Sequence, residues 1–415
     1  MEYKRLGDYI REVNVRNREL KVTNLLGLSI EKRFIPSIAN TIGTDMSSYK
    51  IVSPTQFAYV PVTSRNGDKI TIALYKGMEN AIISQAYIVF EVIDHDVLLP
   101  EYLMMWFRRP EFDRYARFHS HGSAREVFEW EELCDVMLPI PSITCQREIV
   151  SEYETLTNRI HLNEQMIQKL EATAQALYRK MFVDNIDKEN LPNGWRMGTL
   201  GEVAKINSGK TCINKSDVKD ENYQYPVAGA SGIIGFSSTY NYDEKLMTTG
   251  RVGTLGVVNR YNQKMYMADN VLVVRSHFYE YCYQVLNSLD YSEITKGGVQ
   301  SLITQTDLND IATIIPSDNT LDEFEEHSSS IYTFVEIKKR ENLKLTELQS
   351  LLLAKMGQYE HLPISPRFSR RRHSISAPMD LYLCTDAFSK ACLNMQAKSA
   401  IITLPRRNGC LRVIQ

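Results

Sequence analysis

Hydrophobic residues recur at alternating intervals of four and three along two segments of the chain, which is the spacing of a coiled-coil seam. The first segment runs from Gln146 to about Asp187 and contains neither Pro nor Gly, and the second covers residues 320–357. Each segment is predicted to form one long helix. The predicted seam positions are Ile149, Leu156, Ile160, Asn163, Ile167, Leu170 and Leu177 in the first helix, and Ile331, Val335, Lys338, Asn342, Leu345 and Leu352 in the second.

Polar residues interrupt both seams near the middle, at Asn163 in one helix and at Lys338 and Asn342 in the other. A buried polar residue in a seam costs stability but can fix register or orientation. We predict that the two helices pair with each other as an antiparallel coiled coil. About 36 residues would span roughly 54 Å, the length of on the order of 16 base pairs of DNA. An ordinary dimerisation or packing element is the alternative that periodicity leaves open.

Each helix ends a repeated passage. Residues 122–182 align without a gap on residues 297–357, at an offset of 175, so that Pro141-Ser142 falls on Pro316-Ser317. Near the front of each half, Leu6-Gly7-Asp8 resembles Leu200-Gly201-Glu202 at an offset of 194. The repeat therefore predicts two similar modules with a fixed start, a variable middle and a helical end. A duplicated fold whose halves have unrelated roles remains the alternative.

The middles of both halves are rich in β-branched and aromatic runs broken by turn signals, which is typical of strands and hairpins. The predicted fold class is α+β, with two β-rich domains, each followed by a long helix. The predicted segments are 1–145 for the first β-rich domain, 146–187 for the central helix, 188–319 for the second β-rich domain, 320–357 for the C-terminal helix, and 358–415 for a basic, poorly ordered tail.

Taken together, these residues resemble the specificity subunits of type I restriction-modification systems, over Tyr3 to about Gly357. The resemblance rests on the two LGD/LGE starts, on YPVAGASGIIG followed by TGRVGTLG in the second half, and on the twice-repeated Pro-Ser passage leading into a helix. It implies a DNA-recognition subunit that reads a split, asymmetric site with its two domains and docks methylation subunits through its helices.

The resemblance also implies the partners and cofactors. The expected partners are double-stranded DNA, two methylation subunits and, through the complex, restriction subunits. This chain is expected to be non-catalytic and to bind no cofactor or metal, whereas S-adenosylmethionine, ATP and Mg belong to the partner subunits.

The charge distribution weighs against nucleic-acid binding by most of the chain. Residues 358–415 carry a net charge of +6, so that residues 1–357 carry −8. That tail, with Arg370-Arg371-Arg372, could be a fused or frameshifted terminus, a basic arm or a partner-binding element.

The chain shows no secretory signal and no apolar run long enough to span a membrane, so a cytoplasmic location is expected and no membrane partner.

Motifs for catalysis are weak. Ser208-Gly209-Lys210-Thr211 resembles part of a phosphate-binding loop, but position 204, where the first glycine would fall, is alanine. The chain lacks the Asn/Asp-Pro-Pro-aromatic cluster of a methyltransferase. His119 and His121 are expected to lie in a surface loop without carboxylate partners, not in a metal site.

Base and phosphate contacts call for Arg, Lys, Asn, Gln or Thr side chains on loops. The candidates for DNA binding are Arg65, Lys69 and Lys76 in the first module, and Lys210, Arg251 and Thr254 in the second. Two other classes of function stay open. One is a non-catalytic coiled-coil adaptor that carries two protein-binding modules, and the other is an enzyme that uses the loop around Lys210.

Overall fold

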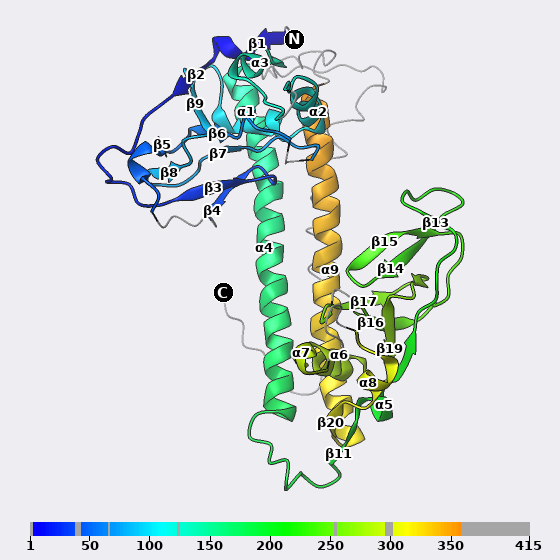
Figure 1. The fold of residues 1–415 in the computed structure, drawn as a ribbon. Coiled ribbons are helices and arrows are strands. Elements are labelled where there is room, and N and C mark those ends of the chain that lie inside the picture. The colour runs from blue at the N-terminus through cyan, green and yellow to red at the C-terminus, as the bar shows by residue number, and fades with distance from the viewer. Residues whose placement is uncertain are drawn as a thin grey trace, which may run out of the picture. The chain divides into compact units, whose positions relative to one another are not determined.

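The computed structural model describes residues 3–37, 43–64, 67–122, 125–252, 255–294 and 302–357 (Figure 1). The predicted basic tail, together with Arg65 and Thr254, lies outside these described residues. Within the described part of the chain, no helix combines the length and the apolar character that crossing a membrane requires.

The first module is built on a four-stranded antiparallel sheet with the order β2-β9-β6-β7, accompanied by three two-stranded pairings. Three short helices cover its core. The elements are β1 (Tyr3–Arg5), η1 (Leu6–Asp8), β2 (Ile10–Val13), β3 (Leu26–Ser29), β4 (Arg33–Pro36), η2 (Met46–Ser48), β5 (Lys50–Val52), β6 (Phe57–Tyr59), β7 (Ile72–Leu74), β8 (Ala81–Ile83), β9 (Ile88–Val92), α1 (Pro100–Phe107), α2 (Pro110–Phe118), α3 (Trp130–Cys134) and β10 (Met137–Pro139).

The second module repeats this plan with the sheet order β12-β19-β16-β17, and it adds a second four-stranded sheet, β13-β15-β14-β18. Its elements are β11 (Arg196–Thr199), α5 (Leu200–Val203), β12 (Lys205–Ser208), β13 (Lys215–Ser216), β14 (Tyr225–Gly229), β15 (Gly232–Ser237), β16 (Lys245–Gly250), β17 (Val258–Asn262), β18 (Tyr266–Met267), β19 (Val271–Arg275), α6 (Tyr279–Ser288), α7 (Tyr291–Ile294), α8 (Gln305–Asn309) and β20 (Ala312–Ile315). The α+β class with two β-rich modules is confirmed.

The repeated LGD/LGE starts have the same structural reason. Leu6 and Leu200 are fully buried in the two cores. A Cβ on Gly7 would lie 2.8 Å from the Cβ of Cys134, and one on Gly201 would lie 2.8 Å from Oδ1 of Asn309. Cys134 and Asn309 are themselves separated by the 175-residue offset, so both glycines allow the same close packing of the module's start against its end.

A further equivalence is invisible in the sequence. The Tyr102 hydroxyl of α1 donates to the Pro139 carbonyl oxygen at 3.1 Å, and the Tyr281 hydroxyl of α6 donates to the Ile314 carbonyl oxygen. Pro139 and Ile314 again differ by 175 residues. Helices α1 and α6 are therefore counterparts, although their sequences share little besides Glu101-Tyr102 and Glu280-Tyr281.

The long helices are α4 (Ile143–Phe182) and α9 (Asp318–Met356), which lie side by side (Figure 1). Helix α4 begins three residues before the predicted start because the Ser142 hydroxyl accepts from the Cys145 N–H as its N-cap, and it ends at Phe182, short of the predicted Asp187.

Interhelical contacts show that the two helices are antiparallel, as predicted. Asn163 Nδ2 donates to Asn342 Oδ1 at 2.8 Å, and Gln349 Nε2 donates to the Thr157 hydroxyl at 2.7 Å. Residues closer to the C-terminus of α4 therefore contact residues closer to the N-terminus of α9. All thirteen side chains assigned to the seam are buried or half-buried.

Both helices take part in both module cores. Ile149 and Val150, near the start of α4, lie in the first core together with Leu353 and Met356 from the end of α9. The second core contains Leu321 and Phe324 from the start of α9, and Tyr178 and Phe182 from the end of α4. Each module is thus packed against the beginning of one helix and the end of the other.

Candidate nucleic-acid interface

The structure brings two of the candidate residues of the second module to one edge of its main sheet. Strands β12 and β16 both pair antiparallel with β19, so they run in the same direction and end at the same edge. Lys210 follows β12 and Arg251 follows β16. The Gly209 N–H donates to the Val271 carbonyl oxygen at 3.0 Å, and the Arg251 N–H donates to the Asn270 carbonyl oxygen at 2.9 Å.

Polar groups gather around this edge. The Thr211 hydroxyl donates to Asp269 Oδ2 at 2.7 Å, while the Lys210 side chain is exposed. Arg251 Nε and Asn270 Oδ1 are buried and have no hydrogen-bond partner among the described residues. An exposed cation at the end of a sheet is well suited to contact a polar ligand.

The loop at Lys210 is not a phosphate-binding loop. In the described chain it leads into β13 rather than into a helix. Gly209 is required for a different reason, because a Cβ there would collide with the carbonyl oxygen of Ala268. The glycine therefore permits strand packing, and the motif gives no support to the enzyme hypothesis.

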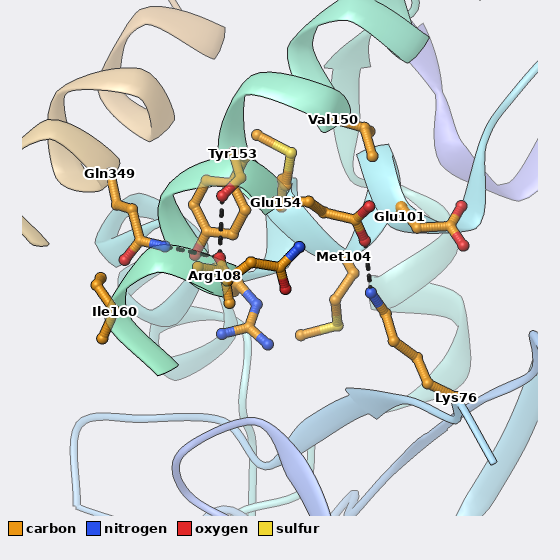
Figure 2. Close-up of a pocket in the computed structure, with 12 residues that line it drawn as sticks. Lys76, Glu101, Met104, Arg108, Val150, Tyr153, Glu154, Ile160 and Gln349 are labelled. Atoms are coloured by element: carbon orange, nitrogen blue, oxygen red, sulfur yellow. Dashed lines mark hydrogen bonds and ion pairs between the residues drawn. The ribbon is translucent and has the colours of Figure 1, made fainter. Parts of the chain in front are cut away.

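In the first module, the candidates are spread out. Lys69 Nζ lies 3.9 Å from Glu31 Oε1. Lys76 Nζ lies 2.8 Å from Oε1 of Glu154 on α4, so this lysine joins the module to the spacer helix (Figure 2). An ion pair this exposed contributes up to about 1 kcal/mol and leaves the lysine able to change partners.

Sequence reasoning missed Arg108. Arg108 is the residue after the end of α1, and its side chain is exposed. Together with Lys76 it lines a cavity of about 230 Å³ between the first module and helices α4 and α9 (Figure 2). The charges of Arg108 and Lys69 both act on the buried Lys32. Arg108, Lys69 and Lys76 therefore lie on one surface, on which Glu31 and Glu154 pair with the two lysines. No signal in the sequence separates Arg108 from other exposed arginines, because only the end of α1 places it there.

Lys32 supports this surface from inside. Its ammonium lies 2.7 Å from Oδ1 of Asp113 on α2, and both side chains are largely buried. Burial lowers the pKa of Lys32, while the hydrogen bond to Asp113 opposes that shift. Asp113 also accepts from the Ile70 N–H at 3.1 Å. The pair fixes the tip of the β3–β4 hairpin to α2 and to the segment that precedes β7.

The expectation for the histidines was wrong in one respect. Glu132 is a carboxylate partner of both, with Oε2 at 2.6 Å from His119 Nδ1 and Oε1 at 4.0 Å from His121 Nε2. Folding brings Glu132 close, on helix α3, and sequence spacing does not show this. Across the described residues, however, no group of three or more His, Cys, Asp or Glu side chains could hold a metal ion.

Two duplicated β-rich modules with polar edges, carried on one antiparallel helix pair, define a two-module recognition protein without an evident reaction centre in the described residues. Comparison with known proteins identifies the class more closely. Residues 192–347 match the type I restriction modification DNA specificity domain family. These residues therefore belong to that family, and the chain as a whole is similar to specificity subunits of type I restriction-modification systems.

Individual relatives are distant. The chain is 22% identical to the type I restriction enzyme MjaIX specificity subunit of Methanocaldococcus jannaschii over 305 residues, which are 64% of this chain and 70% of that protein. It is 24% identical to the HindI specificity subunit of Haemophilus influenzae over 186 residues, 43% of this chain and 40% of that one.

The fold is shared with a solved structure, the S subunit of a type I restriction-modification system from M. genitalium. The TM-score is 0.57 at 14% sequence identity, and the match covers 86% of this chain and 95% of the other.

Proposed function

We propose that the two modules of this specificity subunit each read one half of a split, asymmetric double-stranded DNA site. The observation that carries the proposal is the duplication itself. Two modules share a sheet order and a helical end, but the described part of the second adds a four-stranded sheet. Because each module packs on both long helices, the separation between the two readers would set the length of the unread gap.

The charge of the chain fits local rather than general attraction to DNA. Residues 1–357 carry a net −8, so phosphate contact has to come from restricted basic surfaces. The surface of Lys69, Lys76 and Arg108 would serve the first module, and the edge with Lys210 and Arg251 the second. Arg65 and Thr254, outside the described residues, remain predicted contacts of the same loops.

The helix pair would also dock methylation subunits, and exposed apolar side chains on one side of it support this. Arg159 Nε lies 2.6 Å from Glu341 Oε1 on one side of the seam. One heptad along each helix, Met166 and Phe334 occupy the corresponding positions on that side. Both are exposed, as are the neighbouring Leu162 and Ile337.

These four exposed apolar side chains on the helix pair favour a protein partner. Under this proposal, two methylation subunits dock on the helices and restriction subunits join through the complex. S-adenosylmethionine, ATP and Mg would then be bound by those subunits and not by this chain.

Co-expression with the candidate methylation subunit, followed by mapping of methylated positions across a plasmid library, tests the proposal. We expect one split motif with a fixed gap. Exchange of residues 188–319 for those of another specificity subunit should change one half of the motif and leave the other half and the gap unchanged.

Methylation that does not depend on this chain would refute the reading role. A folded complex that keeps its protein partners but shows no preference for a DNA sequence would favour the adaptor alternative. The net negative charge of residues 1–357 gives that alternative some support.

A further inference from the structure

A buried charge cluster joins the second module to the spacer helix. Both carboxylate oxygens of Glu280, on α6, accept from the guanidinium of Arg260, on β17, at 2.6 and 2.8 Å. Lys245 Nζ, at the start of β16, donates to the same carboxylate at 2.9 Å. The Glu280 side chain is only 1% exposed and that of Arg260 is 12% exposed, so this fork is shielded from water.

Aromatic rings from two helices enclose the arginine. The Arg260 guanidinium carbon lies 3.9 Å from the ring centre of Tyr332 on α9, 4.6 Å from that of Tyr283 and 4.9 Å from that of Tyr279 on α6. Cation–π contacts of this kind are strongest when the cation is desolvated. Tyr332 is in turn fixed by Gln284, whose Nε2 donates to its hydroxyl at 2.8 Å.

The cluster lies at the base of the hairpin that carries the candidate reading edge. Lys245 begins β16, and Arg260 pairs with Met247 across the two strands. The opposite end of the same hairpin leads through Gly250 into Arg251. The orientation of that turn relative to α9 is therefore set where Glu280, Arg260 and Tyr332 meet.

The first module lacks this cluster. Strand β7 holds in the first sheet order the place that β17 holds in the second, because Phe57 of β6 pairs with Leu74 and Met247 of β16 pairs with Arg260. The three residues of β7, Ile72, Ala73 and Leu74, are buried and apolar, so this strand carries no arginine. The first module's charged tie to its helix is the exposed pair of Lys76 and Glu154, so the buried fork is not a requirement of the shared fold.

From this asymmetry we propose that Arg260 is a positioning residue for base selection by the second module. The fork to Glu280 and the stack on Tyr332 fix the hairpin on the spacer, so that the turn at Arg251 meets its half-site in one orientation. This inference rests on the proposed function. It predicts that loosening the fork relaxes recognition of one half-site only, which a general loss of stability would not do.

The test uses the full chain in complex with its methylation subunit. Arg260→Lys keeps the charge but cannot form the two-pronged contact. We expect methylation of sites with one mismatch in the half read by residues 188–319 to rise about tenfold relative to matched sites. Mismatches in the other half should stay excluded. Lys264→Ala, which removes an exposed lysine of the same module 3.6 Å from Asp243, is the control and should change neither half.

Equal relaxation of both halves, or unchanged selection in a folded Arg260→Lys complex, would overturn the positioning role. If that complex does not fold, the double variant Arg260→Leu with Glu280→Gln is mapped instead, because it leaves no carboxylate buried opposite a missing guanidinium. The same one-sided relaxation is expected from it. If the wild-type complex methylates no split DNA motif, the proposed function is overturned, and the role of Arg260 in base selection with it.

Discussion

The amide pair in the helix seam allows a quantitative test of the spacer. Asn163 is 2% exposed, whereas Asn342 is half-buried and also places Nδ2 at 3.5 Å from the Ile160 carbonyl oxygen. Asn163→Leu leaves the half-buried Asn342 amide without its partner. Asn342→Leu leaves the more deeply buried Asn163 amide unpaired and should therefore be the more damaging change.

The expected losses follow from that difference in burial. An orphaned buried polar group costs about 1–3 kcal/mol, so we expect about 1 kcal/mol for Asn163→Leu and about 2–3 kcal/mol for Asn342→Leu. The double variant leaves no orphaned amide and adds apolar contact, so its free energy of unfolding should be close to that of the wild type. The interaction energy of the pair should then be at least about 2 kcal/mol.

Urea unfolding of the four proteins, followed by circular dichroism, measures this cycle, with the exposed Gln165→Leu on the same helix as a control. Losses that simply add in the double variant would refute the reasoning, because they would show that the two amides do not satisfy each other. A greater loss for Asn163→Leu than for Asn342→Leu would show that burial does not decide the cost.

Two further predictions concern the first core and the DNA surface. Gln146 is fully buried, accepts from the Leu99 N–H at 2.9 Å and donates to the carbonyl oxygens of Val97 and Pro141 at 2.8 Å each. Gln146→Leu should therefore lower the free energy of unfolding by about 3 kcal/mol, measured by thermal denaturation, and an effect below that of Gln165→Leu would contradict this. Lys210→Ala and Arg251→Ala should each reduce the slope of log affinity against log salt by about 1 in titrations with the mapped DNA site, and an unchanged slope in both would exclude phosphate contacts at this edge.

The helices and the duplication could be predicted from the sequence because their signals are local and periodic. A seam position is defined by its neighbours three and four residues away, and the polar interruptions at Asn163, Lys338 and Asn342 are visible in the same pattern. The repeat offset of 175 residues likewise identified Pro141-Ser142 and Pro316-Ser317 as equivalent, and Ser142 and Ser317 are the N-caps of α4 and α9.

The surroundings of the candidate residues could not be predicted, because they depend on contacts between distant elements. Lys76 meets Glu154 only because α4 passes beside the module, and Arg108 reaches the surface only because α1 ends there. The cluster around Glu280 joins four elements through residues of ordinary type, and Arg260 stands on a strand whose counterpart in the first module, β7, is apolar. No local pattern distinguishes such an arginine from a solvated one.

Under the proposed function, the connection of both modules to both helices would let a spacer and two divergent readers share one chain. If each module contacted only its own helix, a change in its loops could tilt it independently of the other. Here, Leu353 and Met356 of α9 complete the first core, and Tyr178 and Phe182 of α4 complete the second. The stability of each module therefore depends on the register of the helix pair, while the sheet edges that carry Lys210 and Arg251 are outside those contacts. Loops at the edges can change without altering the spacer, and a change in the spacer register would disturb both cores at once.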